Sequence, residues 1–128
     1  MLSTTQQSKI MVVDDTDQVR ELIGAFLQTR GYDITMATDG EDALGKLEND
    51  TFPLIITDIN MPKMDGIEAT KIIKSLNPNV IIVVQTAFIL SGEERLCQEA
   101  GCDEFITKPI RLKYLLDTID HYLGNKEK

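Results

Sequence analysis

Acidic side chains directly follow two of the apolar runs in this 128-residue sequence. Asp14 and Asp15 come after the run that ends at Val13, and Asp58 comes after the run that begins at Leu54. Two like charges about 4 Å apart repel by ~1–4 kcal/mol in media of dielectric constant 80 to 20. If these strands are neighbours, their carboxylates need a compensating cation, and Mg²⁺ suits a few carboxylates plus water. Each aspartate alone is a common turn or N-cap residue, but all three together favour a shared site.

Two further polar residues follow later apolar runs. Thr86 carries a hydroxyl and Lys108 carries an ammonium. A hydroxyl and an ammonium that face a metal-bound carboxylate form the kind of anion site that phosphoryl transfer needs. Asp58 would be the nucleophile, because a carboxylate can accept a phosphoryl group as an aspartyl phosphate. Separately, Thr86 could satisfy a strand end and Lys108 could be a solvated side chain, but their convergence with the aspartates favours the functional interpretation.

The elements that would position these residues are five short runs, most of them continuously apolar. Such runs are typical of strands buried on both faces of a parallel sheet. The predicted strands are Lys9–Val13, Tyr32–Met36, Leu54–Thr57, Val80–Val84 and Glu104–Ile106. Apolar residues between the runs recur at helical spacing, as in 19–27, 69–76 and 112–123.

Helix start signals agree with this alternation of strands and helices. Thr38 with Glu41, and Ser91 with Glu94, have the spacing of a capping box. Five βα units predict an α/β fold in which a five-stranded parallel sheet is doubly wound, (βα)5, in the flavodoxin-like order 2-1-3-4-5. That order places the ends of strands 1 and 3 side by side. We expect one domain over 9–124, a disordered N-terminal segment over 1–8 and a C-terminal tail over 125–128.

The charge and cysteine content of the sequence limit the kinds of partner and compartment that this domain can have. The chain has 13 basic and 21 acidic side chains and a net charge of −8, which argues against a nucleic-acid partner. Its two cysteines, Cys97 and Cys102, cannot build a disulfide framework and fit a reducing cytoplasm. The polar start at 1–8 lacks the layout of a signal peptide, and the stretch 80–90 is too short to span a bilayer. We therefore expect a soluble, cytoplasmic domain without direct membrane contact.

Four motifs occur in order on the predicted elements. They are Val12–Asp15, the stretch Asp58–Gly66 (DINMPKMDG), Thr86-Ala87 and Phe105–Ile110 (FITKPI). Together they resemble the receiver domain of two-component response regulators, similar to chemotaxis receivers, over about 8–123. The stretch 97–104 resembles receivers that are attached to hybrid sensor histidine kinases, so both a stand-alone protein and a hybrid kinase remain open.

The resemblance implies that Asp58 is the modified residue of a phosphorelay. It would take its phosphoryl group from a phosphohistidine on a partner histidine kinase or histidine phosphotransfer domain. Asp15 and Asp58 would bind Mg²⁺ together with the main-chain carbonyl of Asn60, and Asp14 would act mainly through water. Such a domain catalyses its own phosphorylation and dephosphorylation but turns over no separate substrate.

The same resemblance assigns roles to residues around the acceptor. Thr86 and Lys108 would contact the phosphoryl oxygens, and the peptide between Lys108 and Pro109 is expected to be cis. Phe105 would be the aromatic switch that moves inward when the Thr86 hydroxyl is drawn toward the phosphoryl group. The switch would change a surface that binds a downstream protein, which the sequence does not name.

Three residues depart from the usual receiver pattern. Phe88 occupies a position that is often polar or charged, near the path of attacking water. We hypothesise that Phe88 and Asn60 together set an unusual dephosphorylation rate. Gln85 stands where an apolar residue is commoner, and Phe105 lacks the hydroxyl of the tyrosine variant.

Other functions fit the sequence less well. Asp15 and Asp17 match the loop of a haloacid-dehalogenase-type phosphatase, in which Asp15 would be the nucleophile, but this motif is short and no segment caps the site. A flavodoxin-like electron carrier would need a phosphate-binding loop where this chain has aspartates. A receiver used only for docking would not need the complete acceptor set. The acidic site also predicts that Mg²⁺ raises the melting temperature and that Asp14→Ala stabilises the metal-free protein.

Overall fold

Strands and helices alternate along the whole computed structural model, which describes residues 8–59, 64, 66–86, 92–107 and 111–124. The elements are β1 (Lys9–Val13), α1 (Asp17–Gln28), β2 (Asp33–Ala37), α2 (Gly40–Leu47), β3 (Leu54–Asp58), α3 (Gly66–Leu76), β4 (Ile81–Thr86), α4 (Glu93–Ala100), β5 (Glu104–Thr107) and α5 (Leu112–Leu123). Each of the five predicted strands is therefore present, with ends that differ by at most two residues.

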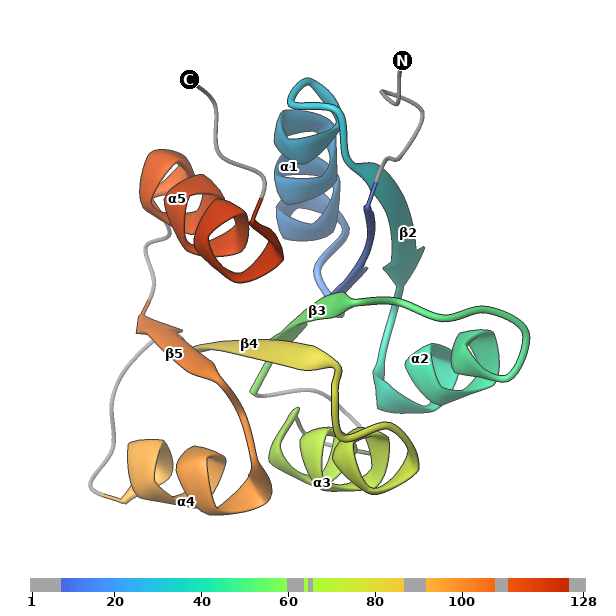
Figure 1. Cartoon of the computed structure of the whole chain (residues 1–128), viewed down its shortest axis with the longest axis vertical. Helices are drawn as coiled ribbons and strands as arrows, with labels where there is room; N and C mark the ends of the chain where they lie inside the picture. Colours follow the sequence, from blue (N-terminus) through green and yellow to red (C-terminus); the bar gives the residue numbers. More distant parts are fainter. Residues whose placement is uncertain (1–7, 60–63, 65, 87–91, 108–110, 125–128) are drawn as a thin grey trace.

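The strands form one parallel sheet in the order β2-β1-β3-β4-β5, as predicted. Helices α1 and α5 cover one face of the sheet, and α2, α3 and α4 cover the other (Figure 1). This is the doubly wound, flavodoxin-like three-layer arrangement. The order reverses between β1 and β3, so the carboxyl ends of these two strands meet at the centre of one sheet edge.

Burial on both faces explains why the strand sequences are continuously apolar. Along β1, Met11 and Val13 belong to the core on the side of α2, α3 and α4. Ile10 and Val12 belong to the core on the side of α1 and α5. All residues of β3 are buried, which is expected for a strand at the centre of a parallel sheet.

The predicted cap of α2 was wrong in detail. Helix α2 begins after Asp39, whose side chain accepts a 2.8 Å hydrogen bond from the N–H of Asp42. The Asp42 carboxylate in turn accepts one from the N–H of Thr38 at 2.9 Å. The N-cap is therefore one residue later than predicted, because aspartate is at least as good an N-cap as threonine. The second bond comes from the N–H of Thr38 and not from that of Asp39, so the two bonds do not form a reciprocal capping box. Helix α4 follows Gly92 with no side-chain cap, and Ser91 lies outside the described residues.

The two cysteines lie at the end of α4, and neither forms a disulfide bond. The main-chain N–H of Cys102 donates to the carbonyl of Cys97 at 3.0 Å, across Gly101 at a φ of +105°. This helix-ending turn brings the half-buried Cys102 against the core that contains Cys97. Burial raises the pKa of the Cys102 thiol, which disfavours the reactive thiolate.

The strand register brings the polar strand ends to one edge. Val13 pairs with Thr57, so Asp14 and Asp58 are the next residues along β1 and β3. Thr86 and Thr107 pair at the ends of β4 and β5. Residue 108 follows directly, but Lys108 and the Lys108–Pro109 peptide lie outside the described residues, as do 1–7 and 125–128. The proposed domain limits therefore stay predictions.

Candidate functional site

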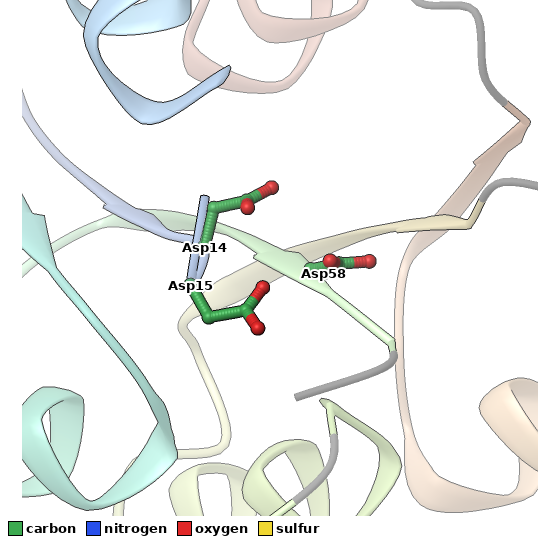
Figure 2. A group of neighbouring side chains, drawn as sticks. All are labelled: Asp14, Asp15 and Asp58. Carbon is green, nitrogen blue, oxygen red and sulfur yellow. The ribbon is translucent and has the colours of Figure 1, made fainter. Parts of the chain in front are cut away.

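Three aspartates meet where β1 and β3 end. Asp14, Asp15 and Asp58 each place one carboxylate oxygen within 4.8 Å of the others. The side chains of Asp14 and Asp15 extend from the end of β1 toward the side on which Asp58 lies (Figure 2). Asp14 and Asp58 are buried, whereas Asp15 is exposed. The structure thus unites the three carboxylates that the sequence singled out.

This donor set fits a hard divalent cation. Carboxylate oxygens are the ligands that Mg²⁺ prefers, and it keeps several waters when it binds to only a few carboxylates. The exposed Asp15 leaves one side of the cluster open to solvent, as a hydrated ion requires. Asn60, which the family resemblance adds to the ligands, lies outside the described residues.

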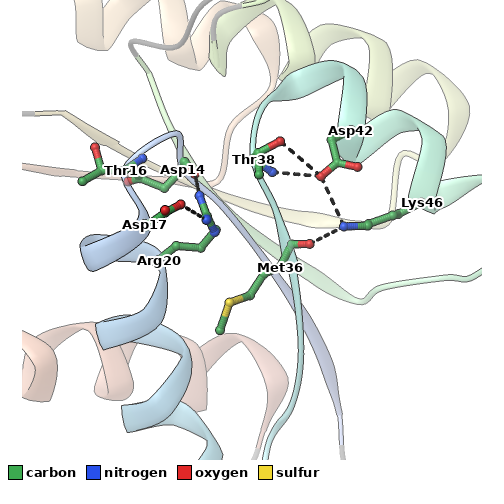
Figure 3. Close-up of polar contacts among 8 residues, drawn as sticks. All are labelled: Asp14, Thr16, Asp17, Arg20, Met36, Thr38, Asp42 and Lys46. Atoms are coloured by element: carbon green, nitrogen blue, oxygen red, sulfur yellow. Dashed lines mark hydrogen bonds and ion pairs between the residues drawn. The ribbon is translucent and has the colours of Figure 1, made fainter.

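Asp14 is anchored by several parts of the protein. Its Oδ1 accepts the N–H of Thr16 at 2.8 Å, and its Oδ2 accepts the side-chain amide of Gln85 at 3.4 Å. Its main-chain carbonyl accepts Nη1 of the buried Arg20 at 2.5 Å. Arg20 reaches this carbonyl from α1 (Figure 3). The first aspartate of the pair is therefore a fixed part of the site, whereas Asp15 faces solvent.

Asp17 does not join the cluster. It forms an ion pair with Arg20 within the first turns of α1, and its side chain is 78% exposed. A phosphatase of the haloacid-dehalogenase type would need Asp17 beside Asp15 as its acid and base. The ion pair holds Asp17 against α1 instead (Figure 3), so this alternative is not favoured.

The switch candidates lie on neighbouring strands. Thr86 is fully buried at the end of β4. Phe105 on β5 pairs with Val84 on β4, and its side chain packs half-buried against the core on the side of α4. Thr86 therefore lies at the same sheet edge as Asp58, while Phe105 lies two residues back along the neighbouring strand, since Thr86 pairs with Thr107.

Gly66 and Arg20 are two residues whose roles sequence reasoning missed. The N–H of Gly66 donates to the carbonyl of Ile59 at 3.0 Å, which ties the start of α3 to the chain just after Asp58. The glycine that closes the Asp58–Gly66 motif was the available signal. Nothing in the sequence distinguished the buried Arg20 from the other basic residues of a surface helix.

Comparison with known proteins identifies the family. Residues 10–120 match the model of the response regulator receiver domain. The chain is a receiver domain. It is 37% identical over 119 residues to the sensor histidine kinase RcsC of Salmonella typhimurium. The matched region is 93% of this chain but only 13% of that kinase. It is also 37% identical over 117 residues to a cyclic di-GMP phosphodiesterase of Thermotoga maritima, of which it spans 31%.

Solved structures support the same assignment. The receiver matches a CheY-like receiver domain protein of Methanospirillum hungatei with a TM-score of 0.90 and 28% identity, covering 94% of this chain and 96% of that one. It matches the chemotaxis protein CheY4 of Vibrio cholerae with a TM-score of 0.85 and 30% identity, covering 91% and 98%. These receivers span nearly the same length as this chain, whereas the chain spans less than a third of the curated relatives.

The helices of this receiver are short. Within the part of the chain that the structure describes, no helix is long and apolar enough to cross a membrane.

Proposed function

We propose that this receiver accepts a phosphoryl group on Asp58 in an Mg²⁺-dependent transfer from a phosphohistidine. The observation that carries the proposal is the convergence of the Asp58 carboxylate with those of Asp14 and Asp15 within 4.8 Å. A divalent cation would relieve the electrostatic repulsion between Asp58 and the two neighbouring carboxylates. The same cation would offset the negative charge of an incoming phosphoryl group.

Asp58 supplies the nucleophile. One of its carboxylate oxygens forms a bond to phosphorus as the bond from phosphorus to the histidine nitrogen breaks, and the imidazole leaves with the electron pair. Asp14 and Asp15 would hold Mg²⁺ with Asp58, and the bound ion would neutralise charge on the phosphoryl oxygens. We assign Thr86 and Lys108 to hold those oxygens through a hydroxyl and an ammonium.

The phosphoryl group would bias a two-state surface. Drawing the Thr86 hydroxyl toward the phosphoryl group would vacate space that Phe105 can enter from β5. We assign the changed surface to α4, β5 and α5, the elements that flank Phe105. Such a switch needs only a free-energy difference of a few kcal/mol between the two states.

The partner that donates the phosphoryl group is a histidine kinase or a histidine phosphotransfer domain. The similarity to part of a sensor histidine kinase supports this class of donor. The acidic balance of the chain argues against nucleic acid as a direct partner of this domain. Two cysteines that form no disulfide fit a reducing compartment, so we place the exchange in the cytoplasm.

Phosphate release from small donors tests this function against the phosphatase alternative. We expect slow release from acetyl phosphate that needs Mg²⁺ and Asp58 and is unchanged in Asp17→Asn. Fast release from a range of phosphoesters, lost in Asp17→Asn but kept in Asp58→Asn, would contradict the proposal.

A further inference from the structure

Gln85 is a polar side chain in an apolar strand. It lies on β4, between Val84 and Thr86, and only 1% of its surface is exposed. Burying an amide without a hydrogen-bond partner costs free energy, so a buried glutamine in a core strand needs a partner. Apolar packing alone does not explain why a glutamine is buried at this position.

The register places Gln85 in the same row as the acidic site. Gln85 pairs with Asp58 on the neighbouring strand. Because side chains alternate along a strand, Gln85 shares a face with Val83, which packs in the core on the side of α1 and α5. Asp58 shares that face with Ile56 in the same way. The amide therefore lies on the same face of the sheet as Asp58, and Asp14 follows Val12 on that face.

The partner of the amide is Asp14. Nε2 of Gln85 donates to Oδ2 of Asp14 at 3.4 Å, and both side chains are buried. Since β3 lies between β1 and β4, the two side chains meet across the strand end that carries Asp58. The N–H of Thr16 binds the other oxygen, Oδ1, at 2.8 Å. The Asp14 carboxylate is thus held at both oxygens, by two different segments.

We propose that Gln85 is a positioning residue that orients the Asp14 carboxylate for the divalent cation. The inference rests on the proposed Mg²⁺ site. A neutral donor fixes the carboxylate without adding the positive charge that would repel the ion. Hydrogen-bond partners of metal-binding carboxylates commonly set metal affinity in this way.

The test is Mg²⁺ affinity in the variant Gln85→Met, which keeps the length of the side chain and removes the donor. The chain has no tryptophan, so isothermal titration calorimetry with Mg²⁺ alone is the suitable measurement. We expect the dissociation constant to rise about tenfold. Val83→Ala is the matched control, because it perturbs the same face of the same strand away from the aspartates, and it should lose stability while keeping the wild-type affinity.

The outcomes distinguish a failure of the positioning role of Gln85 from a failure of the proposed Mg²⁺ site. An unchanged affinity in Gln85→Met would make Gln85 a structural residue, and a tighter one would make it a competitor of the ion. Either result overturns the positioning role. A wild-type protein that binds no Mg²⁺ would instead overturn the proposed site itself. If Gln85→Met does not fold, the side-chain amide resonance of Gln85 in the wild type decides, since it should shift on addition of Mg²⁺ and a static signal would contradict the role.

Discussion

Gly66 at the start of α3 lies directly against the main chain of Asp58. A β carbon added at Gly66 would overlap the main-chain oxygen of Asp58 and come within 2.9 Å of the Cα of Ile59. Only glycine leaves room for this close approach. The position of Asp58 therefore depends on the absence of a side chain eight residues later.

The substitution Gly66→Ala should displace the end of β3. We expect the free energy of unfolding to fall by about 1–3 kcal/mol, because the obstructing atoms are main chain and cannot move aside easily. Gly45→Ala is the matched control within α2, where an added β carbon meets nothing within 4 Å. It should stabilise the protein by about 0.5–1 kcal/mol. Urea unfolding measures both, and equal effects would contradict the packing argument.

Relief of repulsion among the aspartates should be visible in Asp15→Ala. The sequence suggested Asp14→Ala for this purpose, but the carboxylate of Asp14 accepts hydrogen bonds from Thr16 and Gln85. Removing it would leave the Gln85 amide buried without that acceptor, which offsets the gain. Asp15 is exposed, so its loss should stabilise the metal-free protein by about 1 kcal/mol.

Thermal unfolding with and without Mg²⁺ checks this expectation. The ion should raise the melting temperature of the wild type and raise that of Asp15→Ala by less. Melting curves that do not respond to millimolar Mg²⁺ in either protein would count against a shared site.

The hydroxyl of Tyr122 links α5 to the start of β5 by hydrogen bonding. This hydroxyl, which has one proton to donate, lies 2.8 Å from Oε1 of Glu104 and 2.9 Å from the main-chain oxygen of Asp103. Burial, followed by the hydrogen bond to Glu104, raises the pKa of Tyr122 to about 12. The raised pKa means that the neutral phenol stabilises the fold below the unfolded value near 10, and that this contribution is lost as pH rises through about 12.

The variant Tyr122→Phe should therefore lose about 1 kcal/mol of stability at neutral pH. The difference from the wild type should vanish in strongly alkaline solution. Absorbance of the phenolate during a pH titration should lose the component near pH 12. A variant that keeps this component would assign the raised pKa to another tyrosine.

The lifetime of the phosphoryl group should depend on Phe88. The family resemblance implies that position 88 is near the path of attacking water, where an apolar ring would keep that water away, so Phe88→Glu should change the dephosphorylation rate. Decay of the phosphorylated protein after removal of the donor gives that rate. An unchanged lifetime would contradict the hypothesis. Phe88 lies outside the described residues, and the prediction rests on its place two residues after Thr86.

The strand order of this fold could be predicted from the local pattern of apolar residues. Continuous apolar runs identified the strands, and the reversal of order between β1 and β3 put Asp14 beside Asp58, as the register confirms. Exact helix starts were harder, because Thr38 and Asp39 are both good caps and their competition is decided by a few tenths of a kcal/mol.

The contacts that hold the site residues in place could not be predicted in the same way. The role of Gln85 depends on a side chain that reaches across β3, and that of Gly66 depends on a close main-chain approach. Neither leaves a periodic signal in the sequence. Arg20 was also unmarked, because its burial depends on how α1 packs against the loop at Asp14.

The most direct test of the account is the intact mass of the protein after incubation with acetyl phosphate and Mg²⁺. We predict a gain of one phosphoryl group in the wild type that is absent without Mg²⁺ and absent in Asp58→Asn. A gain that persists in Asp58→Asn, or one that does not need the divalent cation, would contradict Asp58 as the acceptor in an Mg²⁺-dependent site.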